Sequence, residues 1–143
     1  MGEARSGGGQ HFPVGSIVEV VEKDAGVRLV CTVIPLPRNI EPEENEGKIY
    51  VRYRALPPRR GRRLREFVDL TSVRPTPPPQ KASKRFEVND VVEAYYKGGW
   101  WEGVVSDSAV LAGGEKRLVV AFETPPGLTS SALGPLSLRP RLD

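Results

Sequence analysis

The segment FPVGSIVEVVE, residues 12–22, returns as FEVNDVVEAYY, residues 86–96, without a gap and at a constant offset of 74 residues. Phenylalanine begins both segments, and Val18-Glu19 lies over Val92-Glu93. The first copy continues with VRLVCTVI and KIYVRYRAL, the second with WWEGVV and KRLVVAFET, and both copies close on Arg-Pro. This internal repeat indicates that the chain holds two copies of one small unit.

Both copies consist of short alternating or β-branched runs separated by Gly, Pro, Asn and Asp, a pattern typical of strands joined by turns. No run has helical periodicity long enough to compete, and the 14 prolines argue against helices. About sixty residues with about five short strands suit a small, strongly bent barrel. We therefore predict an all-β fold with two such barrels.

The repeat also predicts the domain organisation. We expect a disordered N-terminus over residues 1–11, a first unit over 12–79, a linker over 80–85 and a second unit over 86–143. The segment RPTPPPQKAS between the copies combines a stiff proline stretch with a polar one, as linkers do.

Composition narrows the functional class. The chain of 143 residues has no apolar run of the roughly twenty residues that a membrane span needs, and its start lacks the hydrophobic stretch of a secretory signal. We expect a soluble, intracellular protein without membrane contact. The single cysteine, Cys31, cannot form an internal disulfide and lies in an apolar run, so we expect a buried thiol without chemistry.

An enzyme is not expected. The only histidine, His11, lies near the N-terminus, so no histidine-based triad or metal cluster can be built, and no glycine loop suits a phosphate. We predict no catalytic residues, no metal and no cofactor.

The net charge of +3 is unevenly distributed. Residues 1–80 hold 13 Lys and Arg against 10 Asp and Glu, whereas residues 81–143 hold eight of each. The excess comes from RYRALPPRRGRRLRE, residues 52–66, which Pro and Gly punctuate as a hairpin tip. A solvated tip, a nuclear import signal and a patch that contacts phosphates remain open for this run. The candidate phosphate contacts are Arg59, Arg60, Arg62 and Arg63.

Four aromatic residues surround a Gly-Gly turn in AYYKGGWWEGVV, residues 94–105. Residues two apart share a face of a strand, so Tyr95 and Tyr96 point to opposite faces, as do Trp100 and Trp101. A small barrel has only one inside, and at least one Tyr and one Trp should be exposed or half-exposed. Core packing and a ligand surface both remain open for these rings. The aromatic residues that we assign to the core, because their neighbours are aliphatic, are Phe12, Tyr50, Phe67 and Phe86.

The segment FEVNDVVEAYYKGGWWEGVV resembles the opening of a plant Agenet domain, a member of the Tudor-like Royal group. LREFVDLTSVRPTPPP is similar to the close of the first Agenet unit in a tandem pair, and the resemblance covers the chain from Phe12 to Leu142. It implies two SH3-like barrels packed as one rigid tandem, with a non-catalytic role in reading methylated histone tails in the nucleus. Several relatives are similar in binding the histone H3 tail dimethylated at lysine-9, in heterochromatin, which implies a role in gene silencing.

The resemblance also implies an aromatic cage in the second unit. A methylated ammonium keeps its charge and is attracted to the faces of aromatic rings, by roughly 0.5–2 kcal/mol per good contact. The implied cage rings are Tyr96, Trp101 and Phe122, with Trp100 and Tyr95 in reserve. Glu93 or Glu123 would supply a carboxylate that accepts the remaining N–H of dimethyl-lysine.

The first unit departs from this pattern. Glu22 stands where the second unit has Tyr96, and Leu29 lies in a segment where relatives usually place Phe and Trp, so only Tyr53 keeps a ring. Its acidic residues are then expected to hold basic side chains of a histone tail. These residues are Glu19, Glu22, Asp24, Glu41, Glu43, Glu44 and Glu46.

Three functions follow as hypotheses. The first is a monomeric nuclear reader of a methylated H3 tail. The second is a nucleic-acid-binding module that uses the run from Arg52 to Arg65, and the third is a protein-interaction scaffold. A reader needs an acidic groove beside its rings, whereas a nucleic-acid binder needs its rings beside the arginines.

Overall fold

A computed structural model describes residues 12–40, 45–55, 57, 63–78, 86–110, 112–114, 116–122, 130–133 and 137–141. The described residues form ten antiparallel β-strands and two 3-10 turns, with no α-helix among them. The all-β prediction is confirmed. The predicted N-terminal tail and linker lie outside the described residues.

The first unit contains five strands in the spatial order β5-β1-β2-β3-β4. Their bounds are β1 Ile17–Glu22, β2 Val27–Val33, β3 Lys48–Tyr53, β4 Arg65–Asp69 and β5 Val73–Pro75. Two 3-10 turns, η1 Lys23–Ala25 and η3 Leu70–Ser72, connect β1 to β2 and β4 to β5.

The second unit repeats this order as β10-β6-β7-β8-β9. Its strands are β6 Val91–Tyr96, β7 Gly99–Val110, β8 Lys116–Ala121, β9 Ser130–Leu133 and β10 Leu138–Pro140. The two units have the same topology, as the repeat predicts, and each is a small SH3-like barrel.

Strand alternation builds a core in each unit, because every second side chain turns inward. In the first unit the buried apolar side chains include Val18, Val20, Val27, Leu29, Cys31, Val33, Val51, Tyr53 and Val73. In the second they are Val92, Ala94, Trp101, Val105, Leu118, Val120, Phe122 and Leu138. The predictions for Cys31 and Phe86 are confirmed, since both are buried, and Phe12 packs against the core.

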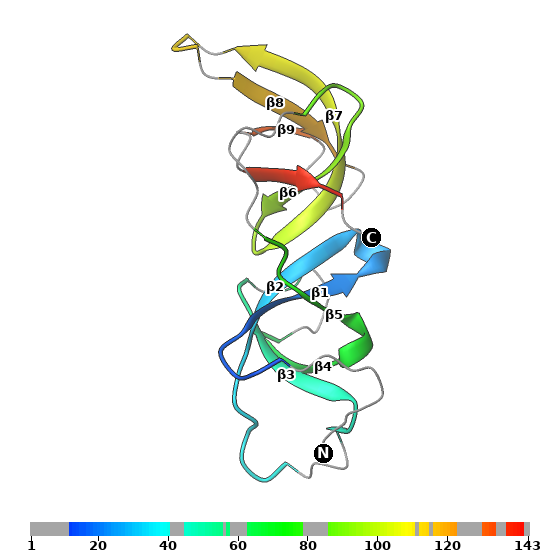
Figure 1. Ribbon diagram of the computed structural model, residues 1–143, viewed down its shortest axis with the longest axis vertical. Coiled ribbons are helices and arrows are strands. Elements are labelled where there is room, and N and C mark those ends of the chain that lie inside the picture. The colour runs from blue at the N-terminus through cyan, green and yellow to red at the C-terminus, as the bar shows by residue number, and fades with distance from the viewer. Residues whose placement is uncertain are drawn as a thin grey trace.

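A direct pairing of β2 with β7 joins the two units into one continuous sheet, so the molecule is elongated with one unit at each end (Figure 1). Arg28 lies opposite Trp100 in this pairing. The two residues also occupy equivalent positions in their units. Arg28 pairs with Val21, and Trp100 pairs with Tyr95, which is the repeat equivalent of Val21 at the offset of 74 residues. The junction is therefore a pseudo-twofold contact between two copies of one strand.

Candidate functional site

The turn between β6 and β7 sets the positions of the four clustered rings. Lys97 and Gly98 have φ of 47° and 77°, the positive values that a two-residue hairpin turn with the twist of its strands requires. In the resulting register, Tyr96 lies opposite Gly99 and Tyr95 opposite Trp100. Tyr96 and Trp101 consequently share the inner face of the sheet, and Tyr95 and Trp100 share the outer face.

The three rings implied for the cage lie on the inner face of the second unit. The indole N–H of Trp101 donates to the carbonyl of Tyr96 over 2.9 Å. Gly103, two residues after Trp101, lets Phe122 approach, since a Cβ there would lie 3.0 Å from the Phe122 ring. The fold thus places Trp101 and Phe122 in one core cluster, with Tyr96 packed against it.

Two of these rings are more buried than we expected. Trp101 is 3% exposed and Phe122 is 7% exposed, whereas Tyr96 is half-buried. Trp101 and Phe122 fill the core of the second unit, whereas Tyr95, Tyr96 and Trp100 are half-buried, as expected for at least one Tyr and one Trp. The ammonium of Lys97 lies 5.3 Å from the Tyr96 ring centroid, so this ring already attracts a cation.

The outer rings belong to the junction between the units. Tyr95 and Trp100 meet edge to face with centroids 5.3 Å apart. The guanidinium of Arg139 lies 4.3 Å from the Trp100 ring centroid, and Arg54 of the first unit donates to the Tyr95 hydroxyl over 3.5 Å. Trp100 therefore already binds a cation of the protein itself, which disfavours its reserve role in a cage.

A buried ionic network lies beside Trp100. Arg139 donates two hydrogen bonds of 2.7 Å to Glu19 and one of 2.7 Å to Glu93. Arg28 lies 3.9 Å from each of these carboxylates. Burial alone would lower the pKa of Arg139, but its hydrogen bonds to the carboxylates and their negative charges outweigh burial and raise it. Arg139 therefore stays charged at neutral pH.

This network corrects two of our expectations. Glu19 was expected to contact a peptide, and Glu93 to complete a cage. Their exposures are 1% and 4%, and Arg139 binds both. Neither carboxylate is presented to a ligand. Sequence reasoning overlooked Arg139, which is 120 residues from Glu19 in the chain, and the signal was the repeated glutamate at equivalent positions of both copies.

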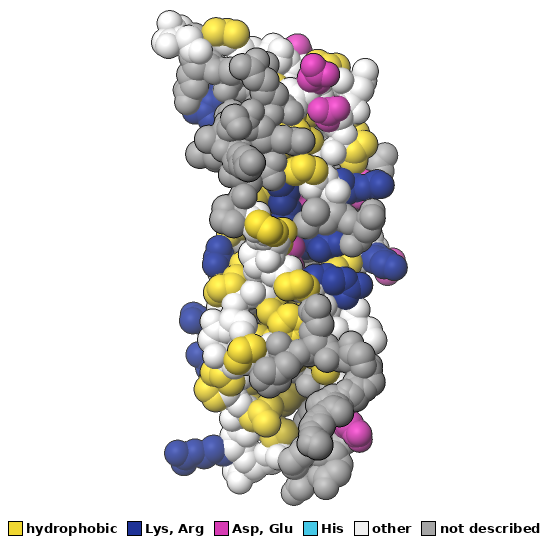
Figure 2. Space-filling model, viewed as in Figure 1, with side chains coloured by type: hydrophobic (Ala, Val, Ile, Leu, Met, Phe, Trp, Pro, Cys, Tyr) yellow, Lys and Arg dark blue, Asp and Glu magenta, His cyan; other side chains and the backbone are white. Residues whose placement is uncertain are grey.

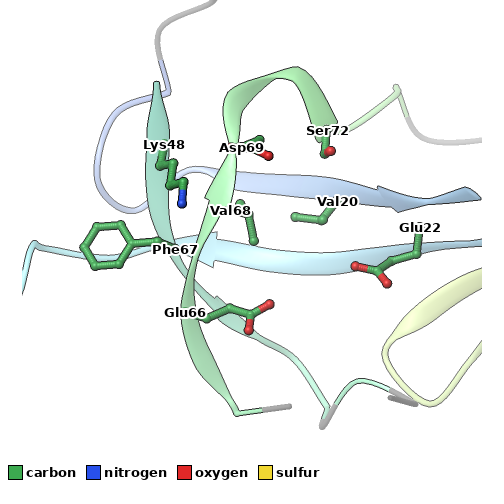
Figure 3. Close-up of a pocket in the computed structure, with 8 residues that line it drawn as sticks. All are labelled: Val20, Glu22, Lys48, Glu66, Phe67, Val68, Asp69 and Ser72. Carbon is green, nitrogen blue, oxygen red and sulfur yellow. The ribbon is translucent and has the colours of Figure 1, made fainter. Parts of the chain in front are cut away.

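An acidic pocket lies in the first unit, where Glu22 takes the place of Tyr96. The buried Tyr53, equivalent to Phe122, donates its hydroxyl to Glu66. Figure 3 shows the carboxylates of Glu22 and Glu66 on the same side of β4. The pocket has a volume of about 330 Å³ and is lined by Val20, Glu22, Lys48, Glu66, Phe67, Val68, Asp69 and Ser72.

The remaining predicted binding residues do not form a common site among the described residues. Asp24 is exposed in η1, and Arg63 is exposed just before β4. Glu46 is exposed before β3. Seven candidates lie outside the described residues, namely Glu41, Glu43, Glu44, Arg59, Arg60, Arg62 and Glu123.

Tyr50 and Phe67 are placed differently from our prediction. We assigned both to the core, but they are only half-buried and pair with each other, with ring centroids 4.6 Å apart. Alternation explains the result, since Tyr50 adjoins the inward Val51 and therefore points outward. The alternation of inward and outward side chains along residues 48–53 was the signal that would have predicted this placement.

Within the described ranges, no cluster of His, Cys, Asp and Glu is arranged to hold a metal ion. No helix in the described part of the chain has the length and apolar composition to cross a membrane.

Comparisons with known proteins agree on one family. The family model of the Agenet domain matches residues 15–78. The protein AGENET DOMAIN (AGD)-CONTAINING P1 of Arabidopsis thaliana is 36% identical over 99 residues, which are 68% of this chain and 18% of that protein. The match spans less than a fifth of that relative.

Two solved structures share the complete architecture. The crystal structure of Arabidopsis thaliana AGDP1 AGD34 is 29% identical with a TM-score of 0.66, over 92% of this chain and 84% of that one. The crystal structure of ADCP1 tandem Agenet domain 3-4 is 30% identical with a TM-score of 0.63, over 92% of this chain and 82% of that one. Both matches extend over the two units.

Proposed function

This chain belongs to the Agenet domain family, with two units in tandem, and on that premise we propose that it reads a histone H3 tail through a methylated lysine. The Agenet domain is a non-catalytic binding module, and we infer that this chain is not an enzyme. We propose dimethylated lysine-9 as the ligand, as the resemblance to Agenet domains implies. The proposed setting is heterochromatin in the nucleus, in gene silencing.

The observation that carries this proposal is the placement of Tyr96, Trp101 and Phe122 on one face, with a cation already near Tyr96. A methylated ammonium is larger and less hydrated than the lysine ammonium, so it gains more from apolar ring faces. Lys97 is tethered to the turn and exposed, and a methylated lysine can replace it against the ring.

The three rings differ in burial, and we propose a different role for the buried rings and for the half-buried one. Trp101 and Phe122 are buried and form the fixed base of the site, while the half-buried Tyr96 is the wall that solvent and ligand reach. Preformed rings reduce the entropy lost on binding, because few rotamers remain to be ordered. With Glu93 committed to Arg139, the proposed cage carboxylate is Glu123.

The acidic pocket of the first unit suits a second basic side chain of the same tail. Among the described residues that line it, the carboxylates of Glu22, Glu66 and Asp69 outnumber the one ammonium, of Lys48. An unmodified lysine or an arginine fits this charge better than a methylated lysine, because carboxylates accept the hydrogen bonds that methylation removes.

A histone-peptide array tests the proposal. We expect peptides with methylated H3 lysine-9 to be retained above their unmodified counterparts, with the dimethylated form preferred. Retention that does not depend on methylation at any lysine would reject the reader and favour the scaffold.

A further inference from the structure

The outer face of the β3–β4 hairpin carries rows of side chains in direct cross-strand register. Tyr50 lies opposite Phe67, and Arg52 lies opposite Arg65 in the next outward row. Outward rows on one strand are about 7 Å apart, twice the rise per residue. The first unit thus places a pair of rings beside a pair of guanidinium groups on one surface.

The ring pair is open on this outer face. The Tyr50 and Phe67 planes are inclined by 41° with centroids 4.6 Å apart, and both side chains are half-buried. Figure 3 shows the Phe67 ring directed away from Val68, Val20 and Glu22, to the other side of β4. These rings therefore contribute faces to the outside of the barrel.

Arg52 and Arg65 lie where their like charges repel each other. Arg52 and Arg65 are exposed and directly opposite, and like charges at such positions destabilise a sheet. Arg54 and Arg63 are exposed close by, and no ion pair joins any of the four to a carboxylate among the described residues. Four positive charges concentrated in this way favour an anionic ligand.

Strand alternation turns the arginines of this surface away from Glu66, and Phe67 lies at the border, since it also lines the acidic pocket. Glu66 turns inward, to Tyr53, while its neighbour Arg65 turns outward. A cationic ligand would be repelled by the arginines, so the ring pair does not suit a methylated lysine. In Figure 2, which shows one face of the molecule, Lys and Arg side chains are prominent along the lower unit and around the junction.

We propose that the outer face of the β3–β4 hairpin binds single-stranded nucleic acid. Guanidinium groups bind phosphate oxygens in a bidentate manner, and exposed rings stack on bases of any sequence. A duplex hides its base faces, and an acidic peptide has no flat group for the rings, so only a single strand uses both rows. RNA and single-stranded DNA share this chemistry. The surface is distinct from the methyl-lysine site.

The test measures fluorescence anisotropy of the full chain with labelled RNA, single-stranded DNA and duplex DNA of one sequence, over a series of salt concentrations. Wild type should prefer the single strands. The double variant Arg52→Ala/Arg65→Ala should lower the slope of log affinity against log salt by about 1.4, at about 0.7 per phosphate. Phe67→Leu keeps an apolar side chain and should weaken binding about tenfold with an unchanged slope, because one stacking contact is lost.

The control is Lys23→Ala/Arg141→Ala, which removes two positive charges from other exposed positions. It should bind like wild type, and polyglutamate should not compete. If the control lost as much affinity as the arginine variant, binding would depend on positive charge in general, and the proposal would be overturned. Equal binding of duplex DNA, competition by polyglutamate, or unchanged affinity in Phe67→Leu would each overturn the assignment to a single strand.

Discussion

Trp100 and Trp101 are adjacent in the chain and serve different parts of the molecule. Trp101 points inward and is 3% exposed, and removing such a side chain from a core typically costs about 3–5 kcal/mol. Trp100 points outward, where it stacks on Arg139 at the junction. Substituting either tryptophan would disturb the fold as well as any ligand contact.

Tyr96 is the residue at which binding and folding can be separated. It is half-buried and packs at the margin of the core, next to the turn. A change at Tyr96 alters the reachable ring of the proposed cage and leaves Trp101 and Phe122 in place. It is therefore the preferred position for a binding test.

At the scale of elements, the β6–β7 turn docks onto the first unit. Gly98 has a φ of 77°, its carbonyl accepts a hydrogen bond of 2.9 Å from Val30, and a Cβ at Gly98 would lie 2.8 Å from the Cβ of Ala55. The turn that positions the rings is thus also part of the inter-unit contact.

We expect Gly98→Ala to destabilise the protein through both backbone strain and steric conflict with Ala55. The matched control is Gly114→Ala, because Gly114 has a φ of 82° but no atom within 4 Å of its added Cβ. Strain alone costs about 1–2 kcal/mol, and Gly98→Ala should cost clearly more. Urea denaturation of both variants measures the difference, and equal losses would mean that the turn does not press on the first unit.

The repeat and strand alternation were sufficient to predict an all-β fold made of two similar units. Strand alternation also predicted that the side chains of Tyr95 and Tyr96 point to opposite faces of the sheet. It could not predict that the outward Trp100 would be partly covered, because Arg139, which stacks on this ring, lies 39 residues later in the chain. Tyr50 and Phe67 were misassigned for a related reason, since aliphatic neighbours in sequence do not report on which face of the strand is inside.

At the scale of the whole molecule, the ionic network fixes one unit against the other. Arg139 of the second unit binds Glu19 of the first and Glu93 of its own. The repeat marks Glu19 and Glu93 in the sequence, but their shared contact with Arg139 forms only when both barrels are in place. Together with the β2–β7 pairing, this contact packs the two units against each other.

We expect Glu93→Gln to lower the free energy of unfolding by about 3–5 kcal/mol, because one partner of a buried ion pair is removed. Glu102→Gln is the control, since Glu102 binds Arg141 over a similar 2.9 Å but both side chains are about half exposed. An exposed pair contributes about 0–1 kcal/mol. Denaturant unfolding compares them, and a loss in Glu93→Gln no larger than in the control would mean that the buried network does not stabilise the protein.

The central claim is that the second unit binds a methylated lysine against Tyr96. Calorimetric titration of wild type, Tyr96→Ala and the first-unit variant Tyr53→Phe with unmethylated and dimethylated H3 lysine-9 peptides tests it most directly. We predict that wild type prefers the dimethylated peptide, that Tyr96→Ala loses about 1–2 kcal/mol, or about tenfold, of that preference, and that Tyr53→Phe retains it. Equal affinity of wild type for both peptides, or a preference lost in Tyr53→Phe and kept in Tyr96→Ala, would contradict the claim.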